Sequence, residues 1–216
     1  LFADGVVTFP PSGYTLSWLR GNYSGLFRPE DSQFDPHQSA DFDLSELYTN
    51  RSGPLPGDHR HFVKVFSAKQ LELPSGFGYV MPGVALRAFS GAPTNVLGAY
   101  AAYIDNVYIE PRGSGERLPW TYSADFRLVY GVKLDQHRTI ALTIDVFNLF
   151  NFQSAAARDE RYTASDVRAV QGGSVRDLTN ADGSTFDRTT QKNPNFGRAT
   201  AYQAPRIFRF GLKGTF

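Results

Sequence analysis

The stretch that decides the fold is residues 120–134, which read WTYSADFRLVYGVKL. Every even-numbered position in it is apolar or aromatic, whereas the odd-numbered positions include Asp125, Arg127 and Lys133. Because successive side chains of a β-strand point to opposite faces, this alternation predicts a strand with one apolar and one polar face. The stretch is much longer than the roughly 5–6 residues of an average strand. A membrane-barrel strand accounts for that length; a soluble sandwich, which buries the apolar face against a second sheet, is the alternative.

The same alternation continues on both sides of this stretch. It predicts further strands over 13–23, 60–73, 77–89, 139–151 and 200–216, and the tail of another strand over 6–9. Short turns at 10–12, 74–76 and 135–138 alternate with long polar segments at 24–59, 90–119 and 152–198. Outer-membrane barrels have short periplasmic turns and long extracellular loops. We therefore expect an all-β fold, a segment of an antiparallel transmembrane β-barrel with about six strands plus a strand tail and irregular, solvated outer loops.

The composition excludes several other classes of protein. The chain has 216 residues, no cysteine and a formal net charge of +1 from 22 basic and 21 acidic residues. This balance gives no excess of basic residues of the kind that binds nucleic acid. The lack of cysteine excludes thiolate zinc sites and cysteine nucleophiles. No apolar run is long enough for a transmembrane helix. The hydrophobic share of 41% is what we expect when only alternate strand residues meet lipid.

Strand parity assigns candidate residues to each environment. The lipid-facing side, including its aromatic girdle, is predicted to carry Trp120, Tyr122, Phe126, Tyr130, Phe208, Phe210 and Phe216. On the polar, lumen-facing side we expect a salt-bridge network of Asp125, Arg127 and Asp145. The candidate extracellular ligand contacts are tyrosines of the long segments, namely Tyr48, Tyr103, Tyr108 and Tyr162.

Asp58, His59 and His61 suggest a metal site, because alternate residues of a strand share a face. The sequence supplies no third ligand of suitable spacing, so we predict a polar outer rim here, with no metal and no cofactor. Nucleophile-elbow, phosphate-loop and HExxH motifs are also missing from the sequence. We therefore do not expect an enzyme; an outer-membrane hydrolase that uses rim Asp and His residues is the remaining alternative.

Several motifs occur in an order that resembles a known family. Residues 145–151 read DVFNLFN, residues 193–197 read NPNFG, and residues 202–212 read YQAPRIFRFGL. This succession resembles the end of TonB-dependent outer-membrane receptors, and GPLPGD at 53–58 with SGAP at 90–93 is similar to their Oar-like branch. The last strand, with Arg209, Gly211 and the final Phe216, resembles the signal read by the barrel-insertion machinery. Gly214 departs from that signal, which has an apolar side chain at this position.

The resemblance implies a 22-stranded barrel of the bacterial outer membrane, occluded by a plug and energised through the TonB complex. We expect residues 1–216 to be the C-terminal portion of that barrel, with the plug and TonB box outside this chain. The opening Leu1, with neither a Met nor a signal peptide, fits a segment of a longer protein. The implied partners are outer-membrane lipid, the barrel-insertion machinery, the remainder of the receptor and the TonB complex. The implied function is uptake or surface binding of an unidentified ligand, and a non-transporting structural or interaction barrel is the alternative.

Overall fold

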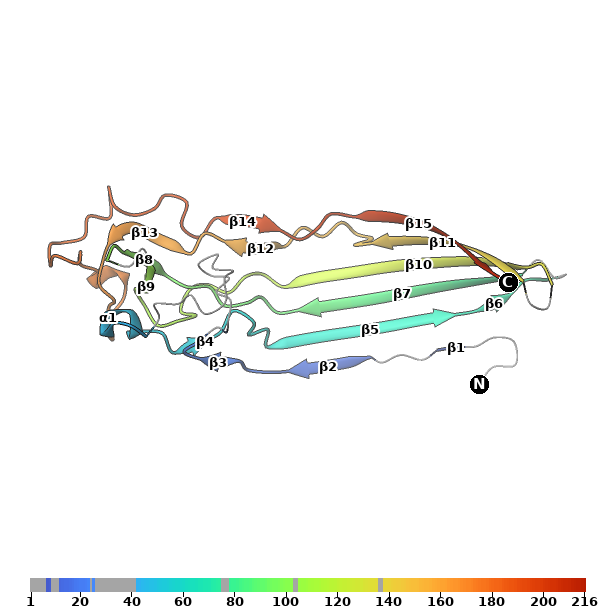
Figure 1. Ribbon diagram of the computed structural model, residues 1–216, viewed down its shortest axis with the longest axis horizontal. Coiled ribbons are helices and arrows are strands. Elements are labelled where there is room, and N and C mark those ends of the chain that lie inside the picture. Colours follow the sequence, from blue (N-terminus) through green and yellow to red (C-terminus); the bar gives the residue numbers. More distant parts are fainter. Residues whose placement is uncertain are drawn as a thin grey trace.

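The computed structural model describes residues 7–8, 12–23, 25, 42–74, 78–102, 105–135 and 138–216. The molecule is elongated and consists of one long sheet with a group of short strands at one end (Figure 1). The all-β class predicted from the sequence is confirmed. Among the described residues, no helix is both long and apolar enough to span a membrane.

The main sheet is an antiparallel meander in which strands lie side by side in chain order. Its order is β1-β5-β7-β10-β11-β15, with β2 beside β5 and β6 beside β7. The bounds are β1 Val7–Thr8, β2 Gly13–Leu16, β5 His61–Lys69, β6 Leu71–Glu72, β7 Tyr79–Phe89, β10 Thr121–Lys133, β11 Thr139–Phe147 and β15 Ile207–Thr215. The alternating stretch that starts at Trp120 thus forms β10, which pairs with β7 on one side and β11 on the other.

The N-terminal end of the sheet differs from the prediction of a strand tail followed by a turn. Val7–Thr8 pairs with one half of β5 and Gly13–Leu16 with the other half, both antiparallel. Because both segments run in one direction along the same edge of β5, the chain does not reverse between them. β1 and β2 therefore occupy one strand position. Residues 10 and 11 of the predicted turn lie outside the described residues.

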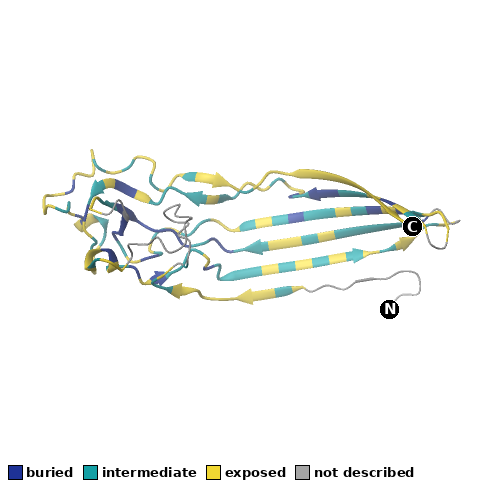
Figure 2. Ribbon diagram, viewed as in Figure 1, coloured by how far each residue is buried: buried dark blue, intermediate teal, exposed yellow. Residues whose placement is uncertain are grey.

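The register gives the main sheet two chemically different faces. The face that carries Tyr122, Phe126 and Tyr130 of β10 is called the apolar face. Along β5, exposed and partly buried residues alternate because successive residues belong to opposite faces, whereas β15 is exposed along its whole length (Figure 2). Phe210 and Leu212 of β15 lie on the apolar face and are 70% and 77% exposed. The opposite face is called the charged face and carries Arg87, Asp125, Arg127, Asp145 and Arg209.

The described parts of the three long segments are more ordered than predicted, because they fold together into an outer module at one end of the sheet (Figure 1). Its elements are β3 Arg20–Gly21, α1 Ser45–Tyr48, β4 Gly53–Pro54, β8 Leu97–Tyr100, β9 Asp105–Tyr108, β12 Ala155–Arg158, β13 Arg161–Asp166, a 3-10 turn at Val175–Asp177 and β14 Ala199–Tyr202. The core of the module consists of Val96, Val107, Ile109, Tyr162, Val167, Leu178 and Phe186. These residues are scattered over two of the long segments without a strand or helix period, so the sequence pattern did not reveal their common core.

Candidate functional site

Three strands place one carboxylate between two guanidinium groups on the charged face. Arg127, Asp145 and Arg209 lie opposite one another on β10, β11 and β15. Arg127 Nε donates to Asp145 Oδ1 at 2.8 Å, and Arg209 Nε donates to Asp145 Oδ2 at 2.8 Å. The Asp145 side chain is 7% exposed, whereas those of Arg127 and Arg209 are 54% and 60% exposed. Both carboxylate oxygens are therefore occupied, while the guanidinium groups keep much of their surface open.

Asp125 belongs to a second ion-pair cluster on the same face. Its carboxylate pairs with Arg87 of β7 and accepts a hydrogen bond from Ser123 Oγ at 2.9 Å. The backbone N–H of Asn148, just after β11, also donates to Asp125 Oδ1 at 2.9 Å. Asp125 thereby connects β7, β10 and the turn that follows β11.

The structure thus divides the predicted network of Asp125, Arg127 and Asp145 into two clusters. Directly opposite and diagonal side chains of neighbouring strands are within reach of each other, so each carboxylate pairs across the sheet: Asp145 with the opposite Arg127 and Arg209, and Asp125 with the diagonal Arg87. The sequence analysis missed Arg87 as a partner and assigned Arg209 only to the assembly signal. Both arginines follow the correct alternation in the sequence, but the strand register, which places Arg209 opposite Asp145 and Arg87 diagonally from Asp125, is not readable from one chain.

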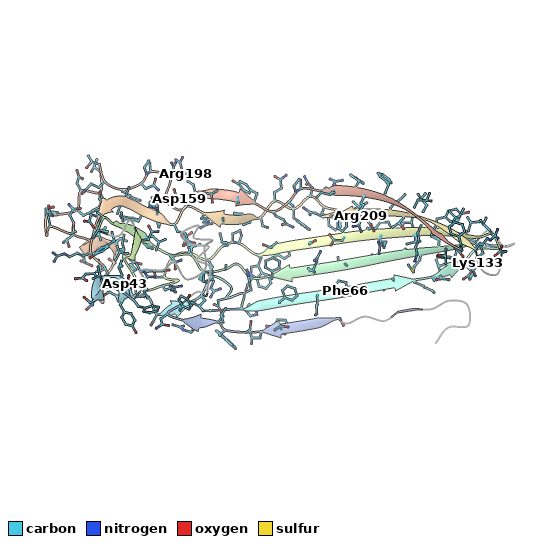
Figure 3. The ribbon with its side chains drawn as sticks, in the orientation of Figure 1. Asp43, Phe66, Lys133, Asp159, Arg198 and Arg209 are labelled. Atoms are coloured by element: carbon cyan, nitrogen blue, oxygen red, sulfur yellow. The ribbon has the colours of Figure 1, made fainter. Side chains whose placement is uncertain are left out.

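A hollow of about 480 Å³ lies between the two clusters on the charged face. Phe66 of β5 and Arg209 of β15 lie on its opposite sides (Figure 3). Lys64 stands opposite Arg87 on the neighbouring strand, so basic groups outnumber carboxylates around the hollow. This arrangement suits electrostatic contact with an anionic or polar surface.

The predicted girdle residues are spread along the main sheet, and only Trp120 and Tyr122 lie near the outer module. Trp120 stacks on Tyr122 with ring centroids 6.2 Å apart, and His61 stacks on Trp120 at 5.7 Å. Tyr130 lies further along the same face, and Phe216 is 90% exposed at the end of the chain. Gly211, the remaining residue of the predicted assembly signal, lies opposite Thr143 in the ladder between β15 and β11.

The four tyrosines named as candidate ligand contacts have different environments. Tyr48 on α1 is 53% exposed and keeps an open ring. Tyr108 is 1% exposed between the guanidinium groups of Arg51 and Arg112, whose Cζ atoms are 5.2 and 4.7 Å from its ring centroid. Tyr162 is 5% exposed and packs in the core of the outer module. Burial gives Tyr108 and Tyr162 a packing role and offers no ring surface to a ligand, while Tyr103 lies outside the described residues.

Asn50 and Gly53 connect the first long segment to the other two. The Asn50 side-chain amide donates to the backbone oxygens of Tyr108 at 3.2 Å, Ile109 at 2.9 Å and Val170 at 3.0 Å. A Cβ atom on Gly53 would lie only 1.9 Å from the Arg112 backbone oxygen, so glycine is required for this close approach. Neither the Asn50 hydrogen bonds nor the close approach at Gly53 is apparent from the sequence pattern.

Asp58 joins the outer module to the main sheet. Its carboxylate, 1% exposed, pairs with Arg117 and accepts a hydrogen bond from the backbone N–H of Leu19 at 2.7 Å. Arg60 Nε is 3.8 Å from the same carboxylate. Burial acts to raise the pKa of Asp58, but the Leu19 hydrogen bond and the positive charges of Arg117 and Arg60 outweigh it and hold the pKa below its usual value. Asp58 therefore remains ionised and connects three segments of the chain.

His59 and His61, which the sequence suggested as metal ligands together with Asp58, form hydrogen bonds with other groups. The Nδ1 atom of His59 donates to the Ser90 backbone oxygen at 2.6 Å, and His61 Nδ1 shares a hydrogen bond with the Tyr14 hydroxyl at 2.7 Å. Within the part of the chain that the structure describes, no three His, Cys, Asp or Glu side chains are grouped to hold a metal ion.

Comparison with known proteins places the chain near one transporter. Over 228 aligned residues, which include the whole chain, it is 40% identical to the TonB-dependent transporter Oar of Myxococcus xanthus. The chain spans about a fifth (21%) of the length of that protein. This similarity confirms the resemblance to the Oar-like branch that the sequence motifs indicated. No protein-family profile matches the chain. No solved structure matches it either.

Replacing Asp145 with Asn should destabilise the complete protein in vesicles by about 1–2 kcal/mol, because two half-exposed guanidinium groups lose their shared carboxylate. The urea concentration at the midpoint of unfolding measures this loss. Glu72→Gln is the matched control, since Glu72 and Lys133 are paired at 3.3 Å but are 49% and 55% exposed. We expect the control to cost less than about 0.5 kcal/mol. Equal midpoints for the two variants would contradict a structural role for the three-strand cluster.

The connection through Asp58 should weaken in acid. A carboxyl group whose pKa is lower in the folded than in the unfolded state stabilises the fold above its unfolded value, here 3.8, and loses that contribution as the pH falls through the folded value. Hydrogen exchange of the backbone amides of Leu19 and Leu118 should therefore accelerate below pH 3.8 beyond the intrinsic pH trend. In an Asp58→Asn variant, exchange at these amides should be faster at neutral pH and lack the additional acid-dependent step. An unchanged acid step in that variant would assign it to another group.

Proposed function

Because the chain is homologous over its whole length to a TonB-dependent transporter, we propose that residues 1–216 are the C-terminal portion of a transmembrane β-barrel in the bacterial outer membrane. The complete protein is then a TonB-dependent receptor or transporter that takes up, or binds at the cell surface, a ligand still to be identified. Its plug and TonB box belong to the protein outside this chain. The observation that carries the proposal is the 40% identity to Oar along the entire chain.

The open edges of the main sheet support a segment of a larger barrel. In the described residues, β1 with β2 forms one edge and β15 forms the other, and each pairs on one side only. The sheet provides fewer strand positions than the eight strands of the smallest bacterial barrels. Further strands of the receptor complete the ring.

The chemistry of the two faces supports one orientation in the membrane. The apolar face meets lipid, because large exposed apolar patches mark membrane or partner contacts and this one follows every long strand. The charged face lines the lumen, where the exposed guanidinium groups of the clusters around Asp125 and Asp145 are solvated. Trp120 and Tyr122 then lie at the outer interface and Phe216 at the inner one. The last strand, with Arg209, Gly211 and Phe216, is the element read by the barrel-insertion machinery.

The outer module captures the ligand outside the membrane. A cavity of about 600 Å³ lies in it beside α1. Its lining includes Glu46, Thr49, Tyr100, Arg168 and Gln171 along with apolar groups. Of the candidate contacts, Tyr48 has an exposed ring and directly precedes Thr49 of this lining. Cavities of this size, with mixed polar and apolar walls, are typical of small-ligand sites.

The alternative function is a structural or interaction barrel that does not transport. The homologue is named as a transporter, which favours uptake and gives no support to an outer-membrane hydrolase. The two remaining functions differ in whether the lumen depends on TonB. In a transporter, energy supplied through TonB changes the contents of the lumen, whereas in a structural barrel the contents of the lumen do not change.

Single cysteines at Thr143 and Ile144 of β11 distinguish these functions, because the chain itself has no cysteine. The experiment uses the complete receptor, with any cysteine elsewhere replaced, in cells with and without TonB, and the probe is a hydrophilic maleimide. Thr143→Cys faces the lumen, so we expect labelling whose rate changes when TonB is removed. Ile144→Cys faces lipid and should remain unlabelled in both strains.

Each failure has a separate meaning. Labelling of Thr143→Cys at the same rate in both strains would favour the structural barrel over the transporter. Equal labelling at Thr143→Cys and Ile144→Cys would contradict the assignment of the two faces.

A further inference from the structure

A narrow apolar groove lies on the apolar face next to the outer module. Its volume is about 290 Å³. Most of its lining is aliphatic or aromatic, and the lining residues are Val63, Val65, Leu86, Arg87, Ala88, Tyr122, Ser123, Ala124, Phe150 and Phe152. Strands β5, β7 and β10 form its floor, and the turn that follows β11 contributes its two phenylalanines.

The turn that carries Phe150 and Phe152 is held in a fixed conformation. Asn148 and Asn151 have positive φ values of 50° and 54°, a backbone state that Asn tolerates better than most residues. The buried Asn148 amide donates to the backbone oxygens of Phe152 and Ala204, both at 2.9 Å, and its Oδ1 accepts from the Phe152 N–H at 2.9 Å. The DVFNLFN motif therefore builds a rigid ridge along one side of the groove.

A continuous row of rings leads from the edge of the sheet to this ridge. Beyond Tyr122, the row continues to Phe152 at 5.9 Å and then to Phe150 at 5.7 Å between ring centroids. At its other end it includes Trp120, His61 and Tyr14. Phe150 itself is 66% exposed, so the ridge presents a large apolar surface that nothing in its own turn covers.

A cationic residue is held beside the ridge through its backbone. Arg206 precedes β15 and is exposed, and its backbone N–H donates to Asn151 Oδ1 at 3.0 Å, which fixes it next to the turn. Among the described residues, the Arg206 guanidinium has no carboxylate partner. An apolar groove whose ridge adjoins an exposed arginine matches an amphiphile with an anionic headgroup, because guanidinium pairs well with phosphate.

We infer that this groove binds one acyl chain of an anionic phospholipid or glycolipid of the surrounding outer leaflet, with Arg206 at the phosphate. This inference rests on the proposed function, which turns the apolar face toward lipid. A lipid fits better than a protein segment for two reasons. The groove belongs to the same face as the rest of the lipid-contacting surface, and its lining offers little polar surface to satisfy the backbone groups of a peptide.

Photocrosslinking of the complete receptor in vesicles tests the site. The vesicles contain phosphatidylcholine and a small fraction of phosphatidylglycerol with a diazirine in its acyl chain, and adducts are mapped by mass spectrometry. We expect adducts to concentrate at Tyr122, Phe150 and Phe152 over Leu212, which lies on the same face outside the groove. Replacing both Phe150 and Phe152 with Ala should reduce the Tyr122 adducts several-fold and leave those at Leu212 unchanged.

Two further variants complete the experiment. Arg206→Gln should abolish the preference for the phosphatidylglycerol probe over a phosphatidylcholine probe with the same diazirine, while retaining the acyl contact. Phe208→Ala, the matched control on the same face, should change neither result. Heat-modifiable mobility on gels verifies that each variant is a folded barrel.

The outcomes separate this inference from the proposed function. Adducts spread evenly over the apolar face would overturn the lipid site and support the orientation of the sheet. Adducts on Leu212 but none in the groove would mean that another segment or protein fills it, which also overturns the inference. A lack of adducts anywhere on this face would contradict the orientation itself.

Discussion

The register of the antiparallel ladder between β7, β10, β11 and β15 is the constraint on which the rest of the structure depends. Because side chains alternate with a period of two, a slip of one residue would exchange the apolar and charged faces completely. The row of Arg127, Asp145 and Arg209 favours the observed register, since the charges pair only when these residues are opposite one another. The same ladder determines where the DVFNLFN turn leaves the sheet, and therefore where its aromatic ridge and the buried amide of Asn148 lie.

The outer module is attached to this sheet by polar contacts at a few positions. Asp58, just before β5, pairs with Arg117 of the segment after β7, and Asn50 connects that segment to the one after β11. The hydrophobic core of the module then holds those segments together. Loops carried on a rigid scaffold are where barrels bind their ligands, so this order gives the proposed capture surface a defined shape.

Much of the sheet could be predicted from the sequence, because strand alternation at 120–134 and 139–151 reports directly which residues share a face. Tyr122, Tyr130 and Phe210 were assigned to one face and Asp125, Arg127 and Asp145 to the other by parity alone. Pairing partners such as Arg87 could not be predicted, since they depend on register between strands. The burial of Tyr108 and Tyr162 was also out of reach, because it results from packing among segments far apart in the chain. Pro10 and Pro11 led to the prediction of a turn. The described residues on either side of them, in β1 and β2, instead pair with the same edge of β5.

The central claim is that this sheet is an open part of a larger membrane barrel, and the distance between its two edges tests that claim most directly. Spin labels at Val7 of β1 and Phe210 of β15, which the strand register places at about the same level along the sheet, report this distance in the complete receptor in vesicles. Neighbouring strands lie roughly 4.8 Å apart, so edges separated by the full width of the sheet should give a distance above about 20 Å. A distance of about 10 Å or less, as for labels on adjacent strands, would mean that the chain closes on itself and would contradict the account.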